Sequence, residues 1–167
     1  MKHKIQIALT ALAVVASTSV VWSDPGENHS PKTEEQSVPF HGTIQGIEIA
    51  DVQFPKLFVV GSGSGKATHL GCFTLAYEVE VDFLTHSTFG SSVFTAANGD
   101  NVFTDIIGFG TPTENPDVHS IVEAHTITGG TGRFAGATGA FIRTYFLNLV
   151  TGVTSGSFAG TIVIHKE

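Results

Sequence analysis

The chain has 167 residues and a formal net charge of −7, with 41% hydrophobic residues and a single cysteine. An acidic chain is repelled by phosphate backbones and by anionic lipid, so we expect no nucleic-acid partner, and no membrane association once a leader is removed. Because Cys72 is alone, an intramolecular disulfide is excluded and the fold must be stabilised by its hydrophobic core.

The first residues have the pattern of a secretory signal peptide. Two lysines precede a segment that runs from Ile5 to Trp22 without a charge, which is the layout of a basic region followed by an apolar region. We predict a signal peptide over residues 1–23; the alternatives are cleavage after Ser19 and retention as a membrane anchor. Loss of the two lysines changes the net charge from −7 to −9, and the mature protein is expected to be secreted or periplasmic.

The next segment, residues 24–37, reads DPGENHSPKTEEQS. It is polar, contains two prolines and has no apolar periodicity, so we predict a flexible N-terminal tether. The remaining residues, 38–167, are numerous enough to form one domain with its own core.

Within this domain the apolar residues recur with a period of two, which is typical of half-buried strands. The clearest example lies between Cys72 and Phe83, where one face carries Phe73, Leu75, Tyr77, Val79 and Val81 and the other carries Glu78, Glu80 and Asp82. Similar runs predict strands at Val38–Ile44, Leu57–Val60, Lys66–Leu70, Ser92–Ala96, Asn101–Phe109, His119–Thr128, Ala140–Leu149 and Ser157–His165.

Turn-forming residues separate these runs, at Gly61–Gly65, Ala97–Asp100, Thr111–Pro116 and Thr151–Gly156. The pair Asn98-Gly99 predicts a hairpin with a type I′ turn, because both central residues of that turn need positive φ. About eight strands and no helical stripe predict an all-β fold. We favour an eight-stranded antiparallel barrel over a sandwich, since closure removes exposed strand edges.

Two glycine-rich stretches invite comparison with phosphate-binding loops. At Gly61–Gly65 the spacing fails, because Ala67 stands where a phosphate loop needs the hydroxyl of Ser or Thr. The stretch Thr128–Ala140, TGGTGRFAGATGA, follows a strand but leads into another strand, whereas a dinucleotide fingerprint needs a helix next. We therefore interpret it as a tight crossing between strands, with Phe134 under the barrel end and Arg133 in water.

The spacing Gly-Gly-Thr-Gly-x-Phe-x-Gly-x-x-Gly, with its first glycine at Gly129 and its last at Gly139, resembles the barrel shared by allene oxide cyclases and dirigent proteins. The chain looks like a bacterial, exported relative of those plant proteins. The resemblance implies a calycin-type barrel of eight antiparallel strands with an apolar cavity, often trimeric. It also implies an activity, where there is one, that steers cyclisation or coupling of small molecules without a metal or organic cofactor.

Polar residues that interrupt apolar strand faces are our candidates for a ligand-binding cluster, because burying them is costly unless they find partners. Four stand out: Tyr77, Asp105, Arg143 and Tyr145. An ion pair of Asp105 with Arg143, together with phenolic hydroxyls, would orient a ligand or protonate an intermediate. The alternative is that these faces pack outward into a subunit interface, with the same ion pair there.

His119, Glu123 and His125 share strand parity and are candidate metal ligands, but a site would need a further ligand from a neighbouring strand. A solvated face is the favoured interpretation, and no metal is predicted.

The sequence leaves three alternative functions. The barrel binds a hydrophobic small molecule in its interior; or it is a cofactor-independent cyclase or isomerase; or it is a structural barrel that forms an oligomer, a dimer or trimer, without a ligand.

Overall fold

The structure is a computed structural model that describes residues 34–85 and 87–166. The predicted signal peptide and most of the predicted tether lie outside the described residues. No helix in this part of the chain has both the length and the apolar character needed to cross a membrane.

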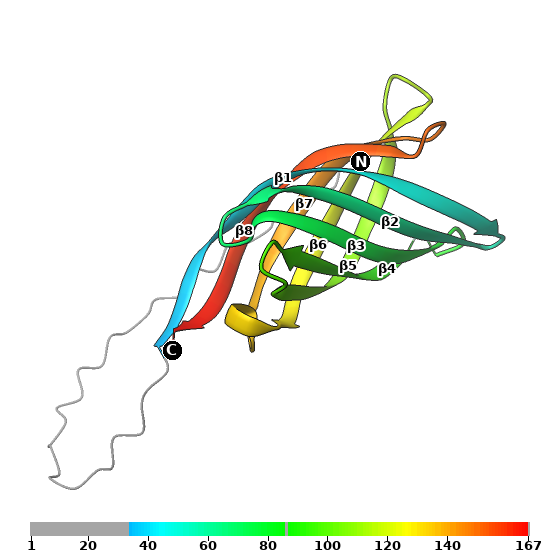
Figure 1. Cartoon of the computed structure of the whole chain (residues 1–167). Coiled ribbons are helices and arrows are strands. Elements are labelled where there is room, and N and C mark those ends of the chain that lie inside the picture. The colour runs from blue at the N-terminus through cyan, green and yellow to red at the C-terminus, as the bar shows by residue number, and fades with distance from the viewer. Residues whose placement is uncertain (1–33, 86, 167) are drawn as a thin grey trace, which may run out of the picture. The chain divides into compact units, whose positions relative to one another are not determined.

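The described residues form eight antiparallel strands that close into a barrel (Figure 1). In chain order they are β1 (Glu34–Gln53), β2 (Lys56–Ala67), β3 (Gly71–Asp82), β4 (Ser87–Ala96), β5 (Asn101–Pro112), β6 (Val118–Gly130), a 3₁₀ turn η1 (Gly132–Phe134), β7 (Thr138–Asn148) and β8 (Val153–Lys166). Each strand pairs with its sequence neighbour, and β1 pairs with β8 to complete the circle. The predicted eight-stranded antiparallel barrel is confirmed.

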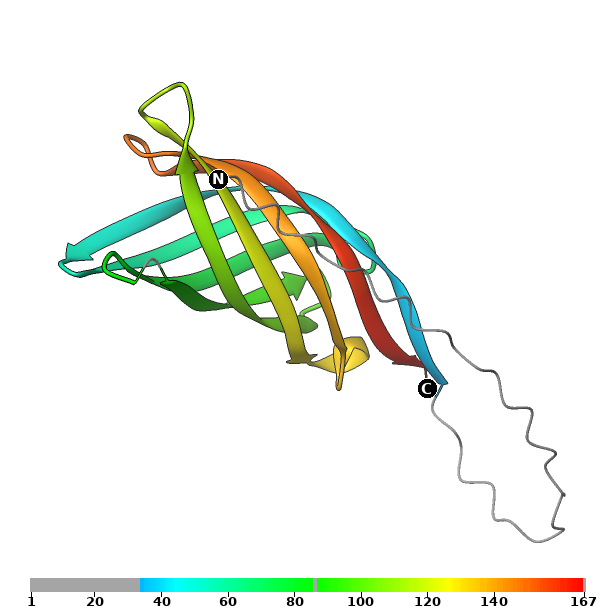
Figure 2. The same ribbon diagram turned by 180° about the vertical axis from the view of Figure 1, so that it is seen from behind.

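The meander places alternate connections at opposite ends of the barrel. The connections β1–β2, β3–β4, β5–β6 and β7–β8 lie at one end, which we call the open end. The connections β2–β3, β4–β5 and β6–β7, with η1, lie at the other, which we call the closed end. Figures 1 and 2 show η1 and the last residues of β8 at the end away from the β5–β6 and β7–β8 connections.

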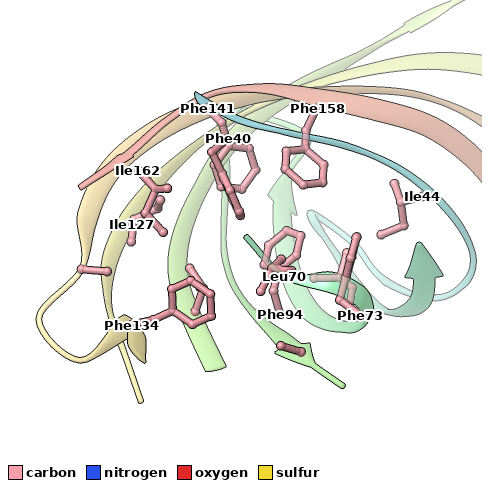
Figure 3. Close-up of a cluster of buried hydrophobic side chains, with 14 of the residues drawn as sticks. Phe40, Ile44, Leu70, Phe73, Phe94, Ile127, Phe134, Phe141, Phe158 and Ile162 are labelled. Carbon is pink, nitrogen blue, oxygen red and sulfur yellow. The ribbon is translucent and has the colours of Figure 1, made fainter. Parts of the chain in front are cut away.

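Aromatic rings fill the interior of the closed end (Figure 3). Phe40, Phe73, Phe94, Phe141 and Phe158 come from five different strands and are all buried. Neighbouring rings pack edge-on or tilted, with centroids 5.0 to 6.1 Å apart, which is the geometry that aromatic pairs prefer. These side chains form part of one buried apolar core in this half of the barrel.

The stretch Thr128–Ala140 covers this end, as the sequence predicted. Phe134 is buried against the barrel and Arg133 is exposed, with its guanidinium 4.9 Å from the centre of the Phe134 ring. Gly132 has φ 56°, and a Cβ there would overlap the carboxylate of Asp100. The glycine is therefore needed for the path of the chain rather than for a phosphate.

Strand bounds differ from the prediction at several places. The glycines Gly61–Gly65 lie inside β2 rather than in a turn, and β2 unites two predicted strands. A Cβ at Gly61 would overlap the ring of Tyr77 on the neighbouring strand, so the glycine makes room for an aromatic side chain. β1 begins at Glu34, inside the predicted tether, because its first residues pair with the end of β8.

Two turns were also predicted incorrectly. β8 begins at Val153, so most of the predicted turn Thr151–Gly156 is strand. The hairpin at Asn98-Gly99 exists, but only Gly99 has positive φ, 89°. Its N–H donates to the carbonyl of Ala96 at 2.9 Å. The connection is therefore not the type I′ turn that the dipeptide predicted.

Candidate functional site

Three of the four predicted site residues face the barrel interior. Tyr77, Arg143 and Tyr145 are buried and lie on β3 and β7. Asp105 is exposed on the outer face of β5, so the prediction that it lies inside was wrong. Both faces of β5 are apolar, and alternation did not show that its even-numbered residues point inward.

The carboxylate that pairs with Arg143 is Glu123, which lies directly opposite on β6. Arg143 Nη1 donates to Glu123 Oε2 at 3.1 Å, and the two side chains are only 1% and 3% exposed. The predicted solvated face for Glu123 and His125 is therefore wrong. Among the described residues, no group of three or more His, Cys, Asp or Glu side chains is arranged to hold a metal ion.

A second carboxylate, Glu48 on β1, completes the cluster. Its Oε1 accepts hydrogen bonds from Tyr77 at 2.6 Å and from Tyr145 at 2.8 Å. The register places Glu48 opposite Gly61, and Gly61 opposite Tyr77. Because Gly61 has no side chain, the Tyr77 phenol reaches across β2 to Glu48.

Tyr145 joins the two carboxylates. Its hydroxyl lies 2.8 Å from Glu48 Oε1 and 3.1 Å from Glu123 Oε1. Burial raises the pKa of both Tyr77 and Tyr145, and the nearby glutamates raise it further. The phenols therefore stay protonated and act as hydrogen-bond donors.

Arg143 is held beneath the two tyrosines. Its guanidinium carbon lies 4.8 Å from the ring centre of Tyr77 and 3.9 Å from that of Tyr145, in cation–π contact. Burial lowers the pKa of Arg143, but the charge of Glu123 and the contacts with Tyr145 and Tyr77 together outweigh it, and the pKa is raised. Among the described residues, Arg143 Nε has no hydrogen-bond partner. The arginine therefore contacts the cluster through its ion pair with Glu123 and through the two aromatic rings.

A chain of buried polar groups continues from Glu123 into the core. His125 Nε2 lies 3.2 Å from Glu123 Oε2, and His125 Nδ1 lies 2.9 Å from the Thr104 hydroxyl, which is 2.7 Å from that of Ser92. Burial lowers the pKa of His125, so the ring is neutral. Because a carboxylate only accepts, the ring proton lies on Nε2, and Thr104 donates to Nδ1.

The charge state of Glu123 follows from the same contacts. Burial raises the pKa of its carboxyl, but the hydrogen bond from His125 and the charge of Arg143 outweigh this, and the pKa lies below its ordinary value. Glu123 is therefore ionised at neutral pH. Arg143 and His125 both donate to Oε2 of this buried carboxylate, and the Tyr145 hydroxyl, whose one proton is shared with Glu48, lies near its Oε1.

Above this cluster lies a cavity of about 360 Å³ that opens at the open end. Glu48, Tyr77, Glu123 and Tyr145 line its floor, and aliphatic side chains form its walls. Among them are Leu57, Val59, Val79, Val81, Ile121 and Leu147. The cavity therefore combines an apolar wall with a few convergent polar groups, which is typical of small-molecule sites.

A larger depression, of about 830 Å³, is shallow and lies mainly on outward-facing residues of β1 to β4 and β8. Lys66 and Cys72 lie in it, and both are exposed. It has none of the buried, hydrogen-bonded groups of the interior cavity, so we assign the candidate site to the interior.

Two residues of the site, Glu48 and Glu123, were not predicted from the sequence. The predicted first strand ends at Ile44, so Glu48 lies outside the predicted strands. Glu123 lies on a predicted strand, but the prediction assigns it to a solvated face. The signal for Glu123 was the crossing at Thr128–Ala140, which joins β6 to β7 and sets Glu123 opposite Arg143.

The comparisons with known proteins agree with this barrel. The chain is similar in structure to the pterocarpan synthase dirigent protein GePTS1, with 12% sequence identity and a TM-score of 0.53. The similarity covers 84% of this chain and 99% of that one. No family model and no curated protein matches the chain. At this identity the likeness shows the fold alone, and the fold is a dirigent-like barrel.

Proposed function

We propose that this barrel binds a hydrophobic small molecule in the cavity at its open end. The observation that carries the proposal is the hydrogen-bonded floor of Glu48, Tyr77 and Tyr145 beneath apolar walls. The cavity, at about 360 Å³, lies at the small end of the usual range of about 300–1,000 Å³ for ligand sites. The dirigent-like fold supports the same function.

The test is to fill the cavity. Ile121 lines the cavity, whereas its neighbour Val122 lies on the outer face. We expect Ile121→Trp to abolish binding of the neutral dye N-phenylnaphthylamine, followed by its fluorescence. The matched variant Val122→Trp should bind the dye as the unmodified chain does. Equal binding by both variants would show that the dye, and the site, lie elsewhere.

A cofactor-independent cyclase or isomerase is the second candidate. It is favoured by two phenols and a carboxylate beside an apolar space, which are groups that transfer protons. In a screen of reactive apolar substrates, Glu48→Gln should abolish turnover. Asp105→Asn is the matched control, because Asp105 is exposed on the outer face. Equal turnover in the two variants would remove the catalytic role of Glu48.

The third alternative, a structural barrel without a ligand, assigned the face of Phe141 and Tyr145 to a subunit interface. Both side chains point inward, so this face is not available to a partner. A homo-oligomer through another face stays a prediction, which sedimentation velocity tests. Export also stays a prediction. The mass of the protein recovered outside the cytoplasm tests it, because cleavage after Ser23 removes residues 1–23.

A further inference from the structure

The charged groups that line the cavity are all of one sign. Glu48, Asp82 and Glu123 line it, and no lysine or arginine does so among the described residues. His119 is the one basic side chain in the described lining. A ligand that enters this cavity therefore meets a negative potential, which is strengthened by the low dielectric of the apolar walls.

Arg143 does not reverse this sign for a ligand. It is 1% exposed, its Nη1 is bonded to Glu123, and the rings of Tyr77 and Tyr145 lie over its guanidinium. It compensates one of the two floor carboxylates and leaves the other without a counter-charge. A ligand carboxylate would find no guanidinium to bind.

The hydrogen-bonding capacity of the floor also favours a positively charged ligand over a carboxylate. The hydroxyl protons of Tyr77 and Tyr145 are directed to carboxylate oxygens, so neither is free for a ligand. Glu48 Oε1 accepts both phenols, whereas no group in the described part of the chain donates to Glu48 Oε2. The floor therefore offers an acceptor, and the unpartnered Arg143 Nε–H is buried outside the cavity lining.

The rest of the cavity fits an apolar body. Aliphatic walls lead to a mouth formed by Phe83, Phe109 and Leu149. Phe54 stacks on Phe83 with the ring centres 6.4 Å apart, and Phe54 is 76% exposed. Apolar surface thus continues from the cavity to the rim, where the far part of an elongated ligand would lie.

We propose that the ligand is an apolar molecule with a protonated amine, whose ammonium binds Glu48 at the cavity floor while its apolar part lies against the walls. This inference rests on the proposed function and names its ligand class. An ammonium supplies both the missing positive charge and the missing donors. An alcohol supplies one donor, and a carboxylate supplies neither.

Three probes of matched length test the ligand class: n-octylamine, n-octanol and n-octanoate. The chain has two tyrosines, both on the floor, and one tryptophan, Trp22. In the full chain carrying Trp22→Phe, intrinsic fluorescence therefore reports on Tyr77 and Tyr145. At neutral pH and low salt we expect octylamine to bind tightest and octanoate weakest, about tenfold or more apart, as expected for one close charge pair.

The variant Glu48→Gln isolates the carboxylate. It should weaken octylamine about tenfold while octanol changes by less than about twofold. Glu78→Gln is the matched control, because Glu78 is exposed on the outer face of β3, and it should leave all three affinities unchanged. If Glu48→Gln does not fold, the order of the three probes on the parent chain decides the question alone.

The outcomes separate the two proposals. If octanol binds and octylamine binds no tighter, or if octanoate binds tightest, the ligand class is wrong and the proposed cavity function stands. If none of the three probes changes the tyrosine fluorescence, both the ligand class and the proposed function are overturned.

Discussion

The two ends of this barrel differ in the residues that their strands direct inward. At the closed end the inward residues are phenylalanines and aliphatic residues. At the open end several polar residues point inward among aliphatic ones: Glu48 faces the cavity while its neighbours Ile47 and Ile49 are exposed, and Arg143 is buried while Ile142 is exposed. One sheet therefore provides an apolar core at one end and a hydrogen-bonded chamber at the other.

This contrast assigns different tasks to the two ends. A packed aromatic core contributes to stability through buried area and close contacts. A buried ion pair and its hydrogen bonds contribute less, because desolvation of the charges offsets their attraction. We infer that the closed end stabilises the fold and that the open end carries the function, so variants at the two ends should separate stability from binding.

The largest expected effect is at the closed end. Phe94 is fully buried and contacts Phe73, Phe141 and Phe158, so Phe94→Ala should lower the free energy of unfolding by about 3–5 kcal/mol. Urea unfolding measures this. Phe89→Ala, an exposed position on the same strand, should cost less than about 0.5 kcal/mol. A small effect of Phe94→Ala would contradict the division of tasks.

A comparable loss is expected where the two ends meet. Arg143→Met leaves Glu123 buried without its counter-charge, which should cost about 3 kcal/mol in urea unfolding. Arg133→Met is the control, because Arg133 is exposed and its pairing with Asp100 is at the surface; it should cost less than about 1 kcal/mol. The idea fails if the two variants are equally stable.

A smaller change in the free energy of unfolding is expected when the pH is lowered. His125 has a folded pKa below its ordinary value of 6.5, so the folded state resists protonation. The stability that this provides is present above pH 6.5 and is lost as the pH falls below it, by up to about 1.4 kcal/mol per pH unit. The lowered pKa of Glu123 has the same sign, but acts below its ordinary value of 4.5.

The variant His125→Gln tests this assignment, since its amide keeps a donor near Glu123 and does not titrate. Thermal unfolding between pH 7.5 and 5 should show a shallower loss of stability in the variant than in the parent. Parallel pH profiles would mean that another group is responsible.

The sequence predicted the closed end better than the open end, for a physical reason. In β3 the alternation of Phe73 and Leu75 with polar neighbours follows ordinary burial, and the barrel follows from eight such runs. In β1 the exposed Ile47 and Ile49 flank Glu48, which faces the interior. The rule that apolar residues face the interior therefore predicts the wrong face of this strand. Asp105 was misplaced because both faces of β5 are apolar.

The candidate site was predictable only in part. Tyr77, Arg143 and Tyr145 were found because polar groups interrupt apolar faces. Glu48 and Glu123 were not, since their positions depend on the register between strands: Gly61 opens the path from Tyr77 to Glu48, and the β6–β7 crossing aligns Glu123 with Arg143. The apolar pattern along one strand does not show which residues of the neighbouring strand lie opposite.

The most direct test of the whole account is a chemical-shift map of the isotope-labelled chain on addition of n-octylamine. The account predicts perturbed amides along the cavity, at Glu48, Tyr77 and Tyr145, with the closed-end residues around Phe94 and Phe158 unchanged. Perturbations centred on Lys66 and Cys72 in the outer depression, or at the closed end, would contradict it.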